Sequence, residues 1–266
     1  MIIHETRVPY VYGDEFTIKP LYDVHYGNTY CDTKALKAYL ADTDDKTYII
    51  GGGDSIDAII TKDFKRYMKH SDATETDAVI DEQVDGLYEI LAPYKKNFIG
   101  LMDGNHEHTI TKHCGTNPMR RLSEKLGCVH LGYSCFVRLV FHEPDGGRVR
   151  TITIKAHHGW GGGTRTEGGS ITKYSKDKAS WVADMFMYGH DHRLQSTRSV
   201  TIGAGANRKM VTKHKFIFLC GSYLKTLSDT TDATYSEIGG YPPIEVGGIS
   251  IKIKPSATWV EVTSDV

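Results

Sequence analysis

The first half of the chain alternates short apolar runs with amphipathic patterns, and polar or glycine-rich connecting segments join the two. Three runs rich in β-branched and aromatic residues have the composition of strands, at residues 16–22, 47–50 and 97–102. Helical spacing appears at 33–40, 59–68 and 78–91, and the last range places Val79, Val84, Leu87 and Leu91 on one face. This order of strand, polar loop and helix predicts a layered α/β fold.

Side chains that can bind metal ions follow the strands of this pattern. Asp23 and His25 come directly after the first run, Asp54 follows the second, and Asn105 follows the third. Two further expected strands, at 151–156 and 182–188, are followed by a second set of donors: His157, His158, His190 and His192. Sites in open α/β sheets form at the carboxyl ends of strands, so we expect these side chains to converge.

The second half of the chain is richer in β patterns. Runs at 135–141 and 149–154 flank Asp145-Gly146-Gly147, which predicts a hairpin. Further strands are expected at 216–220, 249–253 and 259–262, and this tail either completes a sheet or offers a dimer surface. We find no linker or repeat, and the length suits one domain over residues 1–266. The oligomeric state is not readable from the sequence.

Composition excludes several classes of protein. The net charge is -1, so no global basic field attracts nucleic acid. A local cluster at Arg208, Lys209, Lys213 and Lys215 forms either a basic surface or a solvated strand edge or loop. No apolar run reaches the roughly 18 residues of a membrane span, so no membrane partner is expected. The five cysteines form no Cys-x-x-Cys pair, which is typical of reduced thiols in a cytoplasmic protein.

The donor set itself points to two divalent metal ions. Carboxylate and amide oxygens together with imidazole nitrogens suit hard-to-borderline divalent ions, and no cysteine belongs to the set. Manganese, zinc, iron, cobalt and nickel all accept such ligands. The sequence therefore predicts a metal site without thiolate ligands.

The order of these motifs resembles that of the calcineurin-like metallophosphoesterase superfamily. Asp-x-His, Gly-Asp, Gly-Asn-His-Glu, His-Gly and Gly-His-x-His follow one another from residue 23 to residue 192, about two-thirds of the chain. Five motifs in order are far more specific than any one of them. The resemblance implies a four-layer α/β/β/α sandwich, in which two mixed sheets are flanked by helices, and names manganese first among the metals.

The resemblance also implies how the ligands divide between two ions. Asp23, His25 and His192 would hold the first ion, and Asp54 would bridge both. The second ion would be held by Asn105, His190 and one histidine of the His-Gly motif. We prefer His158, because the family's ligand commonly stands immediately before glycine, and His157 is the alternative that the sequence leaves open.

A proton donor and substrate contacts complete the predicted site. His106 would be the general acid, as in the family, with Asp57 as the partner that orients its ring and Glu107 as the rival for that support. For Asp57 the competing interpretation is a helix N-cap before residues 58–60. Arg165, in the glycine-rich stretch 159–169, either binds the substrate together with Asn105 and His106 or belongs to a mobile surface loop.

These residues together predict a phosphoester hydrolase. Two divalent ions, two aspartates and a bridging hydroxide leave a net positive charge, which suits attack of that hydroxide on an anionic phosphodiester and does not exclude a monoester. The alternatives are a nuclease of the same superfamily and a metal-bound interaction scaffold without turnover. Expected partners are accordingly a phosphoester, a nucleotide or a nucleic acid.

Overall fold

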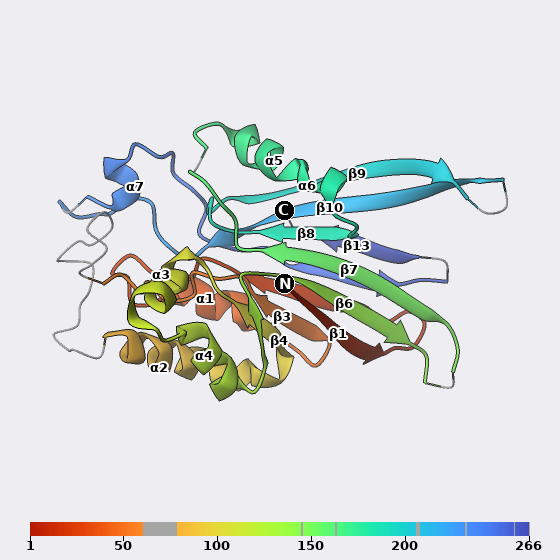
Figure 1. The fold of residues 1–266 in the computed structure, drawn as a ribbon, viewed down its shortest axis with the longest axis horizontal. Helices are drawn as coiled ribbons and strands as arrows, with labels where there is room; N and C mark the ends of the chain where they lie inside the picture. Colours follow the sequence, from red (N-terminus) through yellow and green to blue (C-terminus); the bar gives the residue numbers. More distant parts are fainter. Residues whose placement is uncertain are drawn as a thin grey trace.

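Two mixed β-sheets pack face to face and carry helices on their outer surfaces (Figure 1). The computed structural model describes residues 1–60, 79–144, 146–162, 164–205, 208–231, 233–257 and 259–265. This arrangement confirms the predicted fold class, an α/β sandwich of two mixed sheets flanked by helices.

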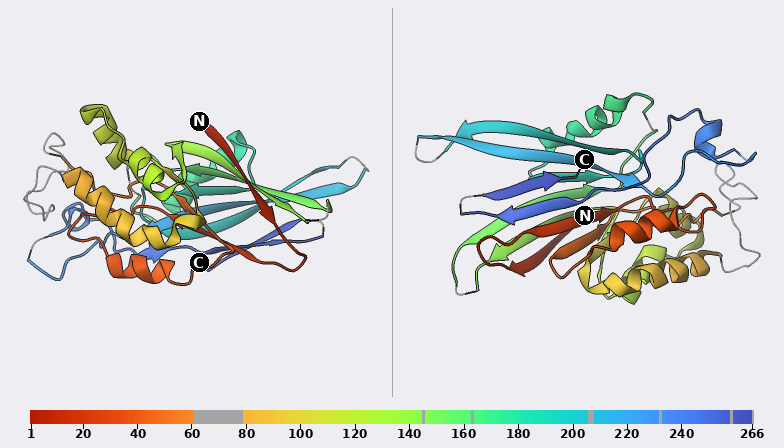
Figure 2. Two further views of the ribbon diagram at one scale, coloured as in Figure 1. Left: turned by 90° about the horizontal axis from the view of Figure 1, so that it is seen from below. Right: turned by 180° about the vertical axis from the view of Figure 1, so that it is seen from behind.

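The larger sheet has seven strands, in the order β1-β6-β7-β8-β10-β11, with β9 paired to β10. Its strands are β1 (Ile2–Pro9), β6 (Ser134–His142), β7 (Val149–His157), β8 (Met185–Tyr188), β9 (Leu194–Ala204), β10 (Met210–Ser222) and β11 (Gly247–Gly248). β7, β8 and β10 are parallel, whereas β6–β7 and β9–β10 are antiparallel hairpins. Figure 2 shows the β9–β10 hairpin extending beyond the rest of the molecule.

The smaller sheet has six strands, in the order β13-β12-β2-β3-β4-β5. They are β2 (Phe16–Leu21), β3 (Thr47–Gly51), β4 (Phe98–Met102), β5 (Val129–Gly132), β12 (Ile251–Pro255) and β13 (Val260–Ser264). β2 to β5 are parallel, and the chain's last two strands close one edge in antiparallel fashion. The β-rich tail therefore contributes strands to both sheets.

The helices divide between the two outer faces and the end of the sandwich where the parallel strands finish. They are α1 (Thr33–Leu40), α2 (Val79–Leu91), the 3-10 helix η1 (Ala92–Asn97), α3 (Asn105–Cys114), α4 (Pro118–Leu126), α5 (Glu167–Ser175), α6 (Asp177–Ser180) and α7 (Tyr235–Ile238). Figure 1 shows α5 and α6 over the larger sheet, α1, α2 and α4 over the smaller one, and α7 at that end.

Three buried apolar clusters separate the four layers. The first lies between the sheets and joins Ile18 of β2 to Val137 of β6 and Met187 of β8. The second packs α1, α2 and α4 against the smaller sheet, and the third packs α5 against the larger sheet. Burial of each such side chain stabilises the fold by about 1.5–3 kcal/mol. The sheets are thus held as a rigid base for the loops at their ends.

Several predicted elements have different limits in the structure. The strand expected at 182–188 begins only at Met185, and Val182, which the apolar pattern included, is 91% exposed and precedes it. The strand expected at 216–220 is the buried end of the longer β10, and the glycine-rich loop expected at 159–169 ends where α5 begins at Glu167. The helix expected at 59–68 is absent at residues 59 and 60, and its remaining residues, like Asp145 of the predicted turn, lie outside the described residues.

Some elements escaped the sequence analysis because their surroundings hide the pattern. β1 and β9 are mostly exposed, so they lack the apolar alternation of a half-buried strand. The basic cluster lies on the projecting hairpin, where Arg208, Lys209 and Lys213 are exposed and Lys215 donates to the carbonyl oxygen of Lys178.

Among the described residues, none of the helices has the length and apolar character needed to span a bilayer.

Candidate metal centre

The predicted ligands lie at the carboxyl ends of five strands. Asp23 and His25 follow β2, Asp54 follows β3, and Asn105 begins α3 just after β4. His158 directly follows β7, and the loop after β8 carries His190 and His192. Three of these strands belong to the smaller sheet and two to the larger one, so the site spans both sheets.

The backbone at these strand ends is strained. Five of the predicted ligands have left-handed backbones: Asp23, His25, Asp54, His190 and His192, with φ of 48°, 50°, 49°, 68° and 55°. A non-glycine residue in this region costs about 1–3 kcal/mol and persists only where the surrounding structure imposes it. Such residues cluster at functional sites, and among the described non-glycine residues only Ala58 and Arg208 also have positive φ.

The close approach of neighbouring loops explains why two positions in the motifs are glycine. A Cβ atom at Gly104 would collide with the carboxylate and backbone of Asp54, and one at Gly189 would collide with the carboxylate of Asp23. These close approaches let the backbone amides of His106 and His190 donate to Asp54 Oδ1 and Asp23 Oδ2, at 2.9 and 2.8 Å. Glycine therefore brings each loop within reach of its neighbour's carboxylate.

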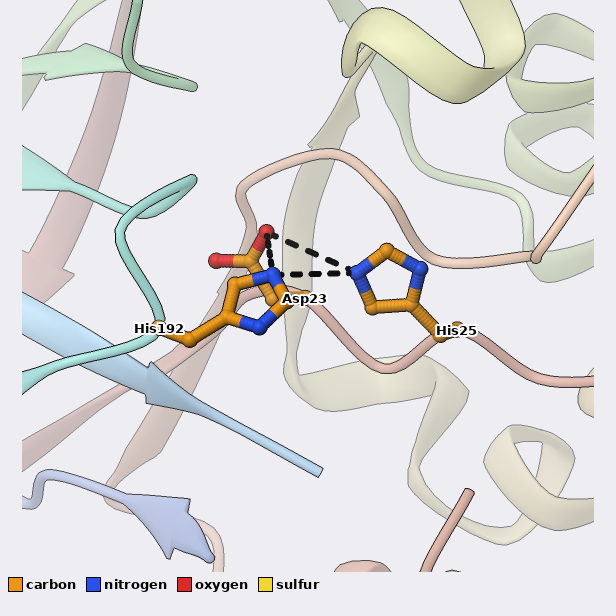
Figure 3. Close-up of side chains that lie close together, drawn as sticks. All are labelled: Asp23, His25 and His192. Atoms are coloured by element: carbon orange, nitrogen blue, oxygen red, sulfur yellow. Dashed lines mark hydrogen bonds and ion pairs between the residues drawn. The ribbon is translucent and has the colours of Figure 1, made fainter. Parts of the chain in front are cut away.

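The first donor group consists of Asp23, His25 and His192 (Figure 3). The two histidine Nε2 atoms are 3.2 Å apart, and Asp23 Oδ1 lies 3.5 Å from His192 Nε2 and 4.0 Å from His25 Nε2. A metal–ligand bond of about 2.0–2.2 Å places neighbouring ligand atoms roughly 3–3.5 Å apart. The three atoms therefore need only small shifts to surround one ion.

The second donor group joins Asp54, His158 and His190 to the amide of Asn105. His158 Nε2 is 3.3 Å from Asp54 Oδ2 and 2.9 Å from Asn105 Oδ1, and His190 Nδ1 is 2.8 Å from the same amide oxygen. These separations also match those around a single ion. The seven candidate ligands thus lie in two groups, and a third group, of His25, Asp57 and His106, overlaps the first; the division of ligands between two ions, with Asp54 as the bridge, stays a prediction.

The electrostatics of both groups favour a bound cation. Asp23 is fully buried, and its Oδ1 receives no hydrogen bond from any described residue. Burial, with Asp54 adding to it, raises the pKa of Asp23 to about 7. Burial lowers the pKa of His158, but the carboxylates of Asp54, Asp23 and Glu107 together outweigh it, and the pKa rises to about 10. Buried carboxylates that draw protons in this way fit divalent cations.

Main-chain carbonyl groups orient the two histidines of the second group. His158 Nδ1 lies 3.0 Å from the carbonyl oxygen of Gly52, and His190 Nε2 lies 2.6 Å from that of Gly161. A carbonyl oxygen only accepts, so each of these ring nitrogens carries the proton. The opposite nitrogens, His158 Nε2 and His190 Nδ1, face the amide oxygen of Asn105, and a metal ion bound there would replace any proton on them.

His157 turns away from this group. Its Nδ1 accepts a hydrogen bond from the backbone amide of Gly159 at 2.9 Å, and its ring packs against Tyr133 and Trp160. Burial lowers its pKa to about 4, which keeps the ring neutral. Geometry therefore favours His158 over His157 as the ligand.

Paired substitutions test this choice. His158→Ala should lose one of the two bound ions, because it removes a donor from the second group. His157→Ala should retain both, since within the described part of the chain its ring packs against aromatic side chains and accepts from the Gly159 amide, away from the donor groups. Equilibrium dialysis followed by elemental analysis measures the ratio of metal to protein. The opposite pattern would transfer the ligand role to His157.

His106 lies beside both donor groups and is held by residue 57. Its Nδ1 is hydrogen-bonded to the main-chain carbonyl oxygen of Asp57, and its Nε2 lies 3.8 Å from Asp54 Oδ2. The Asp57 carboxylate is 4.0 Å from His106 Nδ1 but 3.5 Å from His25 Nδ1, and it accepts from Asn28 Nδ2 at 3.1 Å. Residue 57 thus orients His106 through its backbone and faces His25 with its side chain. Residues 58–60 form no helix that Asp57 could cap.

Glu107 has a larger structural role than the sequence suggested. Its fully buried carboxylate accepts from four backbone amides, those of Gly104, Asp54, Ser55 and Ile56, at 2.6–3.1 Å. It therefore fastens the loop of Asp54 to the start of α3. This role could have been predicted from the position of Glu107 as the third residue of α3, where a glutamate side chain commonly caps the helix.

Glu107→Gln should loosen this clamp. A neutral amide replaces a charged acceptor, and its NH₂ group faces backbone N–H groups, so we expect a loss of about 2–3 kcal/mol in unfolding free energy. Metal affinity should fall by about 10- to 100-fold, as for other residues that support ligands. Chemical denaturation and metal titration measure the two effects, with the exposed Glu124→Gln on α4 as the control. Unchanged metal affinity would show that the clamp does not support the site.

A cavity of about 560 Å³ opens over the donor groups. His25, Asp54, Asn105, His106, His190 and His192 line one end of it. Arg193, which the sequence analysis did not single out although it directly follows His192, also lines the cavity. Arg165 instead donates to the carbonyl oxygen of Gly239 and lies over the ring of Tyr241, so its role in substrate binding stays a prediction.

Comparison with known proteins adds fold similarity only. No family model and no curated protein matches the sequence. Among solved structures, the chain is similar to vacuolar protein sorting 29 from Cryptosporidium parvum, with 14% identity over 94% of this chain and 97% of that one and a TM-score of 0.34. It is also similar to GAP50, the anchor in the inner membrane complex of Plasmodium, with 9% identity over 94% and 84% and a TM-score of 0.47.

A third similar structure is a conserved protein of Streptococcus pneumoniae TIGR4 described as a predicted phosphoesterase. It shares 11% identity over 94% of this chain and 98% of that one, with a TM-score of 0.31. At these values the similarities say nothing about the chemistry of this chain, which has to be argued from its own residues.

Proposed function

We propose that this chain hydrolyses phosphoesters with the help of two divalent metal ions. One observation supports this most strongly: seven oxygen and nitrogen donors form two groups at one end of a cavity, with His106 beside both. Asp23, His25 and His192 would hold one ion, and Asn105, His158 and His190 the other. Asp54 would bridge the two. Manganese is our first choice, and zinc, iron, cobalt and nickel suit the same donors.

When bound, two such ions lower the pKa of a water molecule towards neutrality and stabilise charge on the transferring phosphoryl group. The protein supplies the remaining parts. His106 Nδ1 donates to the Asp57 carbonyl group, so its Nε2 faces the reacting group and can deliver a proton to the leaving oxygen. Asn105 and His106 line the cavity and would contact the substrate together with Arg165.

A diester fits this charge distribution better than a more highly charged monoester. The ions would offset the two buried aspartates, Asp23 and Asp54, and leave a modest positive charge for one anionic group. The lining residues within the described part of the chain include only two arginines or lysines, Arg193 and Lys225, which is few for a nucleic-acid channel. We therefore prefer a small phosphodiester to DNA or RNA. The five free cysteines are in keeping with a cytoplasmic location.

The deciding experiment adds metals back to stripped protein. Hydrolysis of bis-p-nitrophenyl phosphate and p-nitrophenyl phosphate is measured with manganese, zinc, iron, cobalt or nickel. We expect metal-dependent cleavage, faster for the diester. Two bound ions without cleavage of either ester would refute the enzymatic proposal and favour an interaction scaffold.

A further inference from the structure

The far wall of the cavity comes from a part of the chain with none of the metal-binding motifs. The connection between β10 and β11 contributes Leu224, Ile238, Tyr241, Pro242 and Ile244 to the lining. In Figure 1, α7 in this connection lies at the same end of the sandwich as α3. We call the described residues 224–231 and 233–244 the cavity wall.

Hydrogen bonds build the cavity wall and attach it to the metal centre. Tyr223, just before the wall, donates its amide to the carbonyl oxygen of Asp23, and the Lys225 amide donates to that of Tyr30. Within the wall, the buried Thr234 hydroxyl donates to the Thr226 carbonyl oxygen, and the Thr226 hydroxyl accepts from the amide of Ile244. These bonds give the wall a defined shape facing the ligands.

Arg165 fastens the other side of the cavity wall. Its guanidinium group donates to the carbonyl oxygen of Gly239 at 3.1 Å and lies 5.9 Å from the ring centre of Tyr241. The wall is thereby joined to the segment that precedes α5. Arg165 occupies a positioning role here, in addition to the substrate contact that the sequence predicts for it.

The two ends of the cavity differ in chemistry. The end with the ligands carries carboxylates and imidazoles, whereas the cavity wall presents aliphatic side chains, the ring of Tyr241 and neutral hydroxyl groups, and its one cation within the described residues is Lys225. The hydroxyl groups of Thr226 and Thr234 already take part in bonds that hold the wall together. Lys225 faces Asp32 at 3.4 Å, and Arg193 donates to the carbonyl oxygen of Thr164. Among the described lining residues, the wall therefore offers a second anionic group neutral hydroxyls and one lysine that already faces a carboxylate.

We infer that the cavity wall selects a small phosphoester whose organic group is compact, uncharged and largely apolar. This inference rests on the proposed function, because the phosphate is placed at the metal ligands. About 560 Å³ lies within the range of pockets that enclose one small molecule. A polynucleotide would instead need a groove with successive basic and stacking side chains.

Binding of two phosphonates tests the inference without turnover. Phenylphosphonate and methylphosphonate present the same anionic head to the metals and differ only in the organic group. Titration calorimetry on the manganese-loaded protein should show phenylphosphonate binding about 10-fold more tightly, as expected for added apolar contact in a pocket. Inorganic phosphate serves as the reference for binding at the metals alone.

Matched variants locate the source of the preference. Leu224→Asn and Ile238→Asn change the cavity wall, and Ile238 is 68% exposed, so its replacement should leave folding intact. Both should bring the affinity ratio close to unity while phosphate binding is retained. Leu227→Asn alters an exposed leucine of the same segment that is not part of the lining, so the ratio should persist.

The outcomes separate this inference from the proposed function. Equal binding of the two phosphonates would overturn the inference that the wall selects the substrate. An unchanged ratio of their affinities in both wall variants would do the same. Neither result would contradict the proposed metal centre. Tighter binding of a short oligonucleotide than of phenylphosphonate also overturns it, in favour of a nuclease. If the metal-loaded protein binds neither phosphate nor either phosphonate, the proposed function fails and the inference fails with it.

Discussion

Asp54→Ala is expected to abolish metal-dependent hydrolysis and to release metal at the same time. Asp54 Oδ2 lies 3.3 Å from His158 Nε2, and Asp54 Oδ1 receives the backbone amide of His106, so the substitution removes a ligand and an anchor of α3. Metal ions stabilise the charge of a phosphoryl transition state by several kcal/mol, so kcat/KM should fall by roughly 10³-fold or more.

Thermal unfolding gives a second measure of the same loss. A ligand present at 100 times its Kd stabilises the native state by about 2.7 kcal/mol, so manganese should raise the Tm of the unaltered protein by roughly 5 °C. The Asp54→Ala variant should show no such increase. The exposed Asp229→Ala serves as the control, because it removes a carboxylate that belongs to neither donor group and does not line the cavity. A variant that still binds two ions and is stabilised by manganese would contradict the bridging role.

His106→Gln should separate chemistry from metal binding. The imidazole is not needed in either donor group as we assign them, so both ions should remain bound. Loss of general acid catalysis lowers kcat by about 10²- to 10⁴-fold, and the loss should be largest for esters with poorly stabilised leaving groups. An alkyl phosphodiester should therefore suffer more than bis-p-nitrophenyl phosphate, whose leaving group departs without a proton.

The neighbouring helix turn provides the control for this prediction. His108 is exposed on α3 two residues further on and does not line the cavity, so His108→Gln should hydrolyse both substrates at the normal rate. Equal losses for good and poor leaving groups in His106→Gln would contradict proton donation and indicate a positioning role. Loss of metal in that variant would instead place His106 among the ligands.

The positions of the candidate ligands could be predicted because they depend on local pattern. Each donor follows a short apolar run, and a run such as residues 97–102 forms a strand because its residues suit a buried, pleated surface. Parallel strands bring their carboxyl ends to one edge, so the donors after β2, β3 and β4 had to lie near one another. The left-handed backbones of Asp23 and His190 could not be foreseen, since neighbouring loops impose them.

The orientation of individual side chains depended on contacts distant in sequence. Whether His157 or His158 faces the site is set by the pairing of β7 with β6 and β8, because successive residues of a strand point to opposite faces. The support of His106 by the carbonyl oxygen of Asp57, in place of its carboxylate, depends on the path of the loop after β3. Neither feature has a signature in residue spacing.

By itself, the sequence determined the α/β class, the set of oxygen and nitrogen donors and the strand ends that carry them, because periodicity and turn residues act over a few positions. Tertiary structure alone decided how close the donors of each group lie, how Glu107 clamps the Asp54 loop, and which side chains line the far side of the cavity. The cavity wall starts about 200 residues after Asp23 and reaches the site through hydrogen bonds such as that from the Tyr223 amide to the Asp23 carbonyl oxygen. Such contacts follow from how the sheets pack, and packing is a property of the whole chain.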